Sequence, residues 1–324
     1  MTKPKNRPRP RYSHETRVDW NDIPPGMSKW TVYFQRRKDY LAMVFPLGGI
    51  FPLIRPTSGI AADFAPYAVD FFDFCTYACP YCIKSYVKHC FYMQKPRGQD
   101  MEKIYNLYNA GDLKNELKEK KLNQPVLLCP YCDPYSGTKN RLERAKALIE
   151  AFRYTNTPFT LCTKNARSLL SQAEYYATFR DVAQIGTTLL SCEYNRAMQL
   201  EPKCPPPMQR VVGLRKNKEL QNNTFVSICP LLSFDDAFSV FEKTYDCVDW
   251  YYLGAYEGLD DYRASVGVTE HLSETLAQCV ETLREAGLKF LVGKSLAAQC
   301  PDVPLAFEES EPTVYWKYVE TNGT

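Results

Sequence analysis

The chain has 324 residues, which is enough for one large core or for about two domains. Forty basic and 37 acidic residues leave a formal charge of +3, too small to indicate nucleic-acid binding by itself. Three histidines exclude a multi-histidine metal site, and thirteen cysteines without a signal segment or an apolar membrane span predict reduced or metal-bound thiols, a cytoplasmic location and no membrane partner.

The first part of the chain, residues 1–65, is rich in proline and has no sustained hydrophobic period. Lysines and arginines alternate with prolines over residues 3–11, a pattern typical of a disordered basic arm. Such an arm either contacts phosphates or only keeps the protein soluble. We expect an N-terminal extension on the main domain.

From residue 66 to 290, short apolar runs alternate with helical patterns, as in repeated βα units with a parallel sheet. The strand candidates are residues 69–74, 125–128, 158–161, 184–190, 224–228 and 249–253. Helices are expected over residues 142–152 and over 272–286, the second ending at Gly287. Six units predict an α/β fold, a partial (β/α)6 TIM-like barrel, followed by a C-terminal tail over residues 291–324; a doubly wound sheet is the alternative.

Chemically reactive residues follow the predicted strands. They are Cys75, Cys129, Cys162, Ser191 with Cys192, and Cys229. Parallel α/β folds build their sites at the carboxyl ends of the strands, although free cysteines are also ordinary buried residues. We therefore expect the site at this edge of the sheet.

Cys75, Cys79 and Cys82 form a C-x3-C-x2-C triplet after the first predicted strand. A closed zinc site or a simple electron-transfer [4Fe-4S] cluster uses four ligands, so three cysteines leave one coordination position open. Cys90 is the nearby candidate for a fourth ligand that would close the site.

The triplet resembles the cluster motif of the radical SAM superfamily. The resemblance implies a [4Fe-4S] cluster whose open iron binds S-adenosyl-L-methionine (SAM), with a flavodoxin or ferredoxin as reductant. Cleavage of SAM to a 5'-deoxyadenosyl radical then abstracts hydrogen from the substrate, so the hard chemistry belongs to the cofactors.

Further stretches resemble the spore photoproduct lyase-like branch of this superfamily, in chain order. They are Cys132-Asp-Pro-Tyr135, Leu161-Cys-Thr-Lys-Asn165, Thr188-Leu-Leu-Ser-Cys-Glu193 with Gln199-Leu-Glu-Pro202, and Ile228-Cys-Pro-Leu-Leu232 with Asp235-Asp236. The resemblance covers residues 71–236, about half of the chain.

The resemblance also implies roles for individual residues. Lys164 and Thr188 are expected to contact SAM, and Ser191 is a further candidate. Tyr81 is expected to lie by the adenine and to take part in hydrogen transfer. Cys132 or Cys129 would return a hydrogen atom to the product, because an S–H bond is weak enough to donate to a carbon radical. Asp133 and Pro134 are expected only to shape their loop.

The chain also departs from the branch. Ile83 replaces an aromatic residue after the last cluster cysteine, so the relay that recharges the hydrogen-donating thiol is incomplete. Cys129-Pro-Tyr-Cys132 repeats Cys79-Pro-Tyr-Cys82, which leaves two other possibilities open. The two pairs would form one zinc site, or the second pair would hold an auxiliary cluster with two of Cys162, Cys192 and Cys229.

The implied substrate is a nucleobase in DNA, with a thymine derivative favoured, rearranged or modified by an isomerase or lyase reaction. Tyr251, Tyr252 and Tyr256, and the basic residues Lys139, Arg141 and Arg144, are candidates for binding such a base. A short tail after Gly287 and the incomplete relay argue against a thymine-dimer repair lyase. The alternatives are dimer repair, radical modification of a peptide or small metabolite, and a non-catalytic metal-binding nucleic-acid module.

Overall fold

The structure, a computed structural model, describes residues 54–70, 75–77, 79–82, 110–130, 132–137, 139–256 and 259–312. All of them belong to one unit of the chain, residues 53–85 and 96–324. Most of the predicted N-terminal extension lies outside the described residues, as do Cys90 and Ile83.

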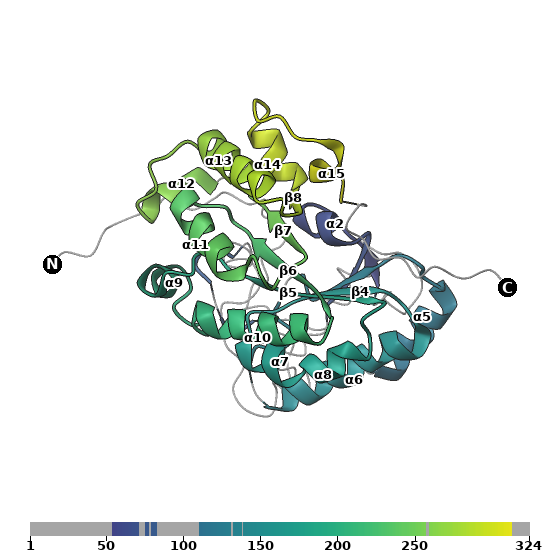
Figure 1. Cartoon of the computed structure of the whole chain (residues 1–324). Helices are drawn as coiled ribbons and strands as arrows, with labels where there is room; N and C mark the ends of the chain where they lie inside the picture. The colour runs from purple at the N-terminus through teal and green to yellow at the C-terminus, as the bar shows by residue number, and fades with distance from the viewer. Residues whose placement is uncertain are drawn as a thin grey trace, which may run out of the picture. The chain divides into compact units, whose positions relative to one another are not determined.

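The described part of the chain forms one sheet of eight strands in the order β1 to β8 (Figure 1). The strands are β1 Arg55–Pro56, β2 Tyr67–Val69, β3 Val126–Leu128, β4 Phe159–Cys162, β5 Ala183–Thr188, β6 Asn223–Ile228, β7 Trp250–Leu253 and β8 Phe290–Val292. Strand β1 pairs antiparallel with β2, and every later pair is parallel. The carboxyl ends of β2 to β8 therefore lie along one edge of the sheet.

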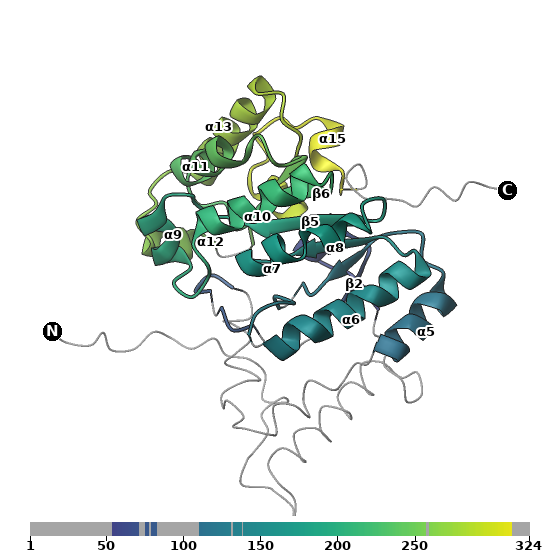
Figure 2. The same cartoon turned by 60° about the horizontal axis from the view of Figure 1, so that its bottom comes forward.

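Helices connect the parallel strands. They are α2 Ile60–Phe64, α5 Ala110–Lys120, α6 Lys139–Thr155, α7 Ala166–Ser171, α8 Ala173–Ala177, α9 Tyr194–Leu200, α10 Pro207–Glu219, α11 Phe234–Thr244, α12 Leu259–Ser265, α13 Leu272–Glu285, α14 Lys294–Gln299 and α15 Phe307–Ser310. Helix α10 covers β5 and β6 and packs against α7, as Figure 2 shows. Helix α13 ends at the predicted place, because Gly287 adopts a φ of 64° that favours glycine.

The predicted strands correspond to β2 through β7, with two corrections. The first of these strands, β2, begins at Tyr67, two residues before the predicted start at residue 69, and residues 71–74 of the predicted run lie outside the described residues. The prediction also missed β8, which pairs parallel with β7, and the short β1. The boundary expected at residue 290 falls inside β8, and α14 and α15 follow, so the chain after Gly287 is not a short tail.

The sheet curls into a partial barrel. One buried cluster contains Leu127 of β3 together with Leu291 of β8, although four strands separate these two in the sheet order. Phe64 of α2 joins this cluster, and α2 packs against α14 next to β8. The α/β partial barrel expected from the sequence is confirmed.

Aromatic side chains fill part of the interior of the barrel. The rings of Phe225 and Trp250 stack with centroids 4.9 Å apart, and the Phe64 ring lies 4.4 Å from that of Tyr252. Gly186 on β5 makes room for them, since a Cβ there would lie 2.5 Å from the Phe225 ring. These residues belong to one buried cluster inside the barrel.

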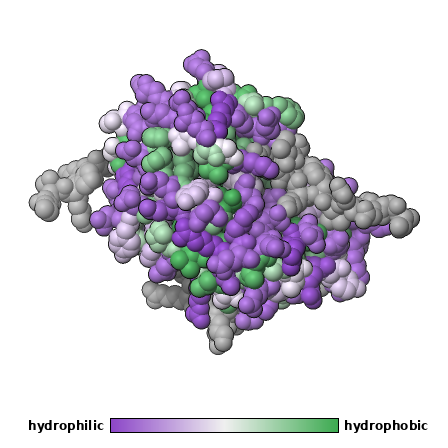
Figure 3. Space-filling view, in the orientation of Figure 1, coloured by the Kyte–Doolittle hydropathy of each residue, from purple (hydrophilic) through white to green (hydrophobic). Residues whose placement is uncertain are grey.

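The outer surface is mostly hydrophilic in the view of Figure 3, with scattered apolar residues between charged ones. Such scattered exposure is usual for a protein surface. None of the described helices has the length and apolar character needed to cross a membrane.

Candidate active site

A partly buried lysine stands at the centre of the site. Lys164 follows β4, and its ammonium group donates to the Tyr81 hydroxyl at 2.7 Å and to the Cys79 sulfur at 3.4 Å. It also lies 3.3 Å from a carboxylate oxygen of Glu201. An ammonium group has three N–H donors, so these three contacts use all of them.

A second cation lies behind the first. Arg210 on α10 is paired with Glu201 at 2.7 Å, and the two side chains are only 1% and 2% exposed. The same guanidinium donates to the backbone oxygen of Thr188 at 2.6 Å, which ties α10 to the end of β5. Tyr81 donates its hydroxyl hydrogen to Oε1 of Glu201, whereas Arg210 is paired with Oε2 of the same carboxylate. We call Cys79, Tyr81, Lys164, Glu201, Cys204 and Arg210 the Lys164 cluster.

The charges of the Lys164 cluster set the protonation of its members. Burial opposes ionisation of Glu201, but Arg210 and Lys164 outweigh it and hold the pKa of this carboxyl below its ordinary value. Burial and the neighbouring Glu201 raise the pKa of Tyr81 well above its ordinary value, so Tyr81 stays a neutral donor. Lys164 stays protonated, since the anionic groups around it raise its pKa against the effect of burial.

Cys79 is the thiol most affected by this setting. Its sulfur lies 3.7 Å from that of Cys204, and a hydrogen bond from Cys204, helped by the charge of Lys164, lowers the pKa of Cys79 to about 6 against burial. The pKa of Cys204 rises correspondingly, chiefly through the same bond. The setting therefore favours the thiolate of Cys79 over the thiol, and the thiolate is the form that binds metals.

The other triplet cysteines lie on the same loop. The N–H group of Cys82 donates to the carbonyl of Cys79 at 3.1 Å, which closes Cys79-Pro-Tyr-Cys82 as a turn. Cys75 and Cys82 are partly buried and pack against the apolar cluster that contains Cys79 and Tyr81. Among the described residues, the ligand atoms gathered within 4.8 Å of the Cys79 sulfur come from Glu201 and Cys204. The number and type of these three thiols fit the donor set of an open iron–sulfur cluster, although the described structure does not gather the sulfurs of Cys75 and Cys82 with that of Cys79.

Asp133 fastens the loops that carry the site. Its carboxylate accepts from the Thr163 hydroxyl at 2.8 Å, from the Lys164 N–H at 2.6 Å and from the Tyr135 N–H at 2.9 Å. Because these donors follow β3 and β4, Asp133 holds the two loops together. This position agrees with the loop-shaping role expected for it.

Of the remaining predicted residues, Thr188 contacts the Lys164 cluster only through its backbone oxygen, which accepts from Arg210. The Thr188 hydroxyl lies 3.6 Å from the Cys162 sulfur, at the ends of β5 and β4. The Ser191 hydroxyl instead lies 3.3 Å from that of Ser239 on α11, so the structure does not bring Ser191 to the Lys164 cluster. The thiols of Cys129 and Cys132 gather with Asp70.

The two open alternatives for the repeated cysteine pair are not supported. Cys79 belongs to one group of potential metal ligands and the Cys129 pair belongs to another, so the described residues do not form one shared zinc site. Cys162 faces Thr188, and neither Cys192 nor Cys229 joins the Cys129 pair within that 4.8 Å grouping, which leaves an auxiliary cluster without its further ligands there.

The prediction that Tyr251 and Tyr252 bind a nucleobase is wrong, because both side chains are fully buried. Tyr251 is fully buried against the helices, where its ring meets Phe241. Tyr252 is fully buried inside the barrel and donates to Asp63. Neither ring is available to stack on a base, because both faces of a parallel sheet are covered. Tyr256 is partly buried, and the side chains of Lys139, Arg141 and Arg144 lie outside the described part of the chain.

Three residues of the Lys164 cluster were missed from the sequence. Glu201 was noticed only as the middle of a Leu-Glu-Pro stretch, and Cys204 follows that stretch by two residues. Arg210 has no signal in the sequence, because nothing distinguishes a buried arginine from a surface one in a largely polar helix.

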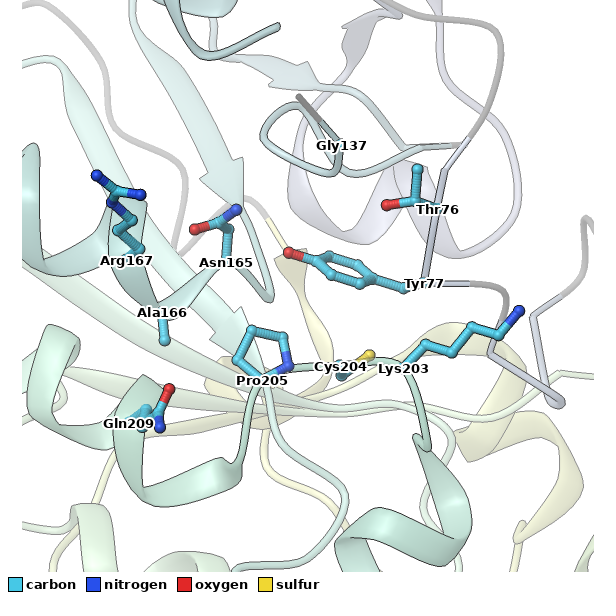
Figure 4. A pocket seen from close by; sticks show the side chains of 10 residues that line it. All are labelled: Thr76, Tyr77, Gly137, Asn165, Ala166, Arg167, Lys203, Cys204, Pro205 and Gln209. Atoms are coloured by element: carbon cyan, nitrogen blue, oxygen red, sulfur yellow. The ribbon is translucent and has the colours of Figure 1, made fainter. Parts of the chain in front are cut away.

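A pocket of about 470 Å³ opens beside the Lys164 cluster (Figure 4). Its walls come from the triplet loop, the start of α7 and the loop before α10, and Figure 4 shows the Tyr77 hydroxyl directed toward Asn165. Cys204 contributes to the wall, so the pocket reaches the neighbour of Cys79.

Comparisons with known proteins support the fold. No family model matches the chain. The uncharacterized protein ORF301 of Acidianus two-tailed virus is 22% identical over 195 residues, covering 56% of this chain and 63% of that protein. Streptococcus suis SuiB bound to its precursor peptide SuiA has a TM-score of 0.52 and 14% identity, over 90% of this chain and 61% of SuiB. SuiB bound to S-adenosylmethionine has a TM-score of 0.52 and 13% identity, over 86% and 60%.

The chain spans roughly three fifths of the length of each of these proteins. The likeness to SuiB concerns the fold, and it agrees with the partial barrel expected from the radical SAM resemblance.

Proposed function

We propose that this chain is a radical SAM enzyme in which Cys75, Cys79 and Cys82 hold a [4Fe-4S] cluster. The observation that carries the proposal is the 3.4 Å contact between the Lys164 ammonium group and the Cys79 sulfur, at the carboxyl edge of a SuiB-like barrel. When bound, the cluster and SAM supply reductive cleavage of SAM and the hydrogen abstraction that follows. A flavodoxin or ferredoxin would supply the electron.

The chain's own residues would bind SAM and orient it. Lys164 contacts Cys79 and would anchor an anionic group of SAM by exchanging this contact, since all three of its donors are engaged. Tyr81 lies against Lys164, where the resemblance places the adenine, and Thr188 offers a hydroxyl at the end of β5. Arg210 and Glu201 hold these groups from behind and keep the wall of the site dry.

We infer a nucleobase in DNA, a thymine derivative, as the substrate, rearranged or cleaved in an isomerase or lyase reaction. Support for this substrate comes from the stretches that resemble the spore photoproduct lyase-like branch. Asp133, Lys164 and Glu201 come from three different stretches, and Lys164 contacts both of the others. A peptide substrate is the second candidate, because SuiB binds a precursor peptide on the same fold.

The first test measures SAM cleavage. Anaerobically reconstituted and reduced protein should release 5'-deoxyadenosine from SAM, and Cys79→Ala should abolish both the cluster absorbance and the release. Cys247→Ala is the matched control, because Cys247 is also buried but lies before β7, at the opposite edge of the sheet. Undiminished release by Cys79→Ala would overturn the enzymatic proposal.

The second test concerns the substrate. DNA carrying thymine deuterated at its methyl group is incubated with the reduced enzyme and SAM, and 5'-deoxyadenosine is analysed by mass spectrometry. Deuterium in 5'-deoxyadenosine is the expected result. Release without deuterium, combined with transfer from a deuterated peptide mixture, would leave the radical chemistry standing and replace DNA by a peptide.

A further inference from the structure

The second Cys-Pro-Tyr-Cys segment lies beside an acidic residue. The sulfur atoms of Cys129 and Cys132 and a carboxylate oxygen of Asp70 lie within 4.8 Å of one another. The Cys132 sulfur is 3.9 Å from Oδ1 of Asp70. The two cysteines are only 4% and 8% exposed, so the thiols are shielded from solvent, while Asp70 is partly exposed.

The backbone brings these atoms together before anything binds. Cys129 follows β3 directly with a φ of 58°, a left-handed conformation that residues with a side chain rarely adopt. It is held there because its N–H group donates to Val69 of β2 at 2.7 Å and its carbonyl accepts from Cys132 at 3.2 Å. Strained positions that the surrounding structure enforces are typical of binding sites.

The carboxylate is oriented by a cation. Arg55 on β1 contacts Oδ2 of Asp70, which leaves Oδ1 on the side of Cys132. Partners of this kind, behind a metal ligand, commonly fix its orientation. The arrangement therefore has two thiols, one directed carboxylate oxygen and an outer residue that holds the carboxylate.

We propose that Cys129, Cys132 and Asp70 bind one zinc ion. Zinc accepts thiolate sulfur at about 2.3 Å and carboxylate oxygen at about 2.0 Å, so tetrahedral ligands of these two kinds lie about 3.5 Å apart. The separation of 3.9 Å between Cys132 and Asp70 is close to this value. Iron–sulfur clusters use three or four cysteines, and this group offers two among the described residues.

Three protein ligands leave the fourth zinc position for water or for a substrate atom, as in catalytic zinc sites. Binding releases the thiol protons, so a zinc-bound thiolate has no S–H hydrogen to give. The zinc site and hydrogen return by Cys129 or Cys132 are therefore mutually exclusive. The proposal does not rest on the proposed radical chemistry.

The test measures zinc in the full-length protein purified after growth with added zinc. Wild type and Cys247→Ala should contain about one zinc per chain, and Cys129→Ser and Cys132→Ser should lose it. Cobalt titration of zinc-depleted wild type should show thiolate-to-cobalt absorption. Asp70→Asn should weaken cobalt binding while keeping both thiols, and Arg55→Gln should weaken it by about 10-fold.

Cys79→Ala distinguishes this site from the cluster, since it should lose iron and keep zinc. Zinc retained by both cysteine variants, or iron and sulfide bound in its place, would overturn the proposal. Deuterium transfer from the Cys132 thiol to product would also overturn it, in favour of hydrogen return. If the cysteine variants fail to fold, Asp70→Asn decides, because unchanged cobalt affinity in that variant contradicts the site.

Discussion

The two Cys-Pro-Tyr-Cys segments have the same residues, and in each the N–H group of the last cysteine donates to the carbonyl of the first, but opposite charges face them. The first turn lies against the ammonium group of Lys164, which helps to favour the thiolate of Cys79. The second lies against the carboxylate of Asp70. The charged residue that faces each segment comes from a different part of the sheet, since Lys164 follows β4 and Asp70 follows β2. Identical local sequences therefore have different electrostatic surroundings.

The ion pairs behind the two turns also differ. Arg210 and Glu201, behind the first turn, are 1% and 2% exposed, whereas Arg55 and Asp70, behind the second, are 30% and 19% exposed. A buried pair is costly to break because it leaves an uncompensated charge, and a partly exposed pair is screened by water. Removing one charge of the pair behind the first turn should therefore cost more stability than removing one charge of the pair behind the second.

The largest expected effect is a separation of the two metals. Cys82→Ala should lose essentially all cluster iron and keep zinc, whereas Cys132→Ala should keep iron and lose zinc. Metal analysis of both variants, prepared in parallel, measures this. Loss of both metals in either variant would show that the two turns form one site and would break the comparison.

Arg210→Leu is expected to lower the free energy of unfolding by about 3–5 kcal/mol, because Glu201 then remains charged and buried. Urea unfolding of the metal-free protein measures it. The control is the double variant Arg210→Leu with Glu201→Leu, which should recover most of the loss. A loss below about 1 kcal/mol would mean that water reaches the pair.

Ser136→Ala tests the link between the two turns. The buried Ser136 hydroxyl accepts from the Thr76 N–H at 3.3 Å and donates to the Asp133 carbonyl at 3.1 Å, so it joins the triplet loop to the loop after the second turn. Its removal should cost about 1–2 kcal/mol of unfolding free energy. Ser265→Ala, on an exposed hydroxyl, serves as the control and should change little.

The smallest effect is expected for Arg55→Leu. Its ion pair with Asp70 is partly exposed, so the unfolding free energy of metal-free protein should fall by no more than about 1 kcal/mol. The same urea measurement compares it directly with Arg210→Leu. Equal losses in the two variants would contradict the difference in burial on which the comparison rests.

Much of the fold was predictable, because the apolar runs mark the strands from β2 to β7 and Gly287 marks the end of α13. The prediction did not include β8, although β8 is as long as β3, which was predicted, so strand length does not explain the omission. The tyrosine prediction was wrong because it relied on composition. Tyr251 and Tyr252 alternate along β7, so one faces the helices and the other the barrel interior.

The site was predictable where its residues lie in local motifs, as Cys79 and Lys164 do. Its remaining members come from distant parts of the chain, and Cys204 is 125 residues from the Cys79 that it contacts. Arg210 and Glu201 are buried as a pair, and a pairing between helices is not encoded in either segment alone. Tertiary packing therefore supplies the electrostatics of the site.

The aromatic filling of the barrel has a kinetic consequence. Phe225, Trp250 and Tyr252 fill the barrel interior, and the pocket beside the Lys164 cluster is lined by loops at the carboxyl edge of the sheet, so we expect ligands to use that edge. Ligands then arrive and depart by the same side, and the ligand that binds deepest has to enter first and leave last. We therefore expect ordered binding, with the bulkier substrate following SAM and blocking its exit until turnover is complete.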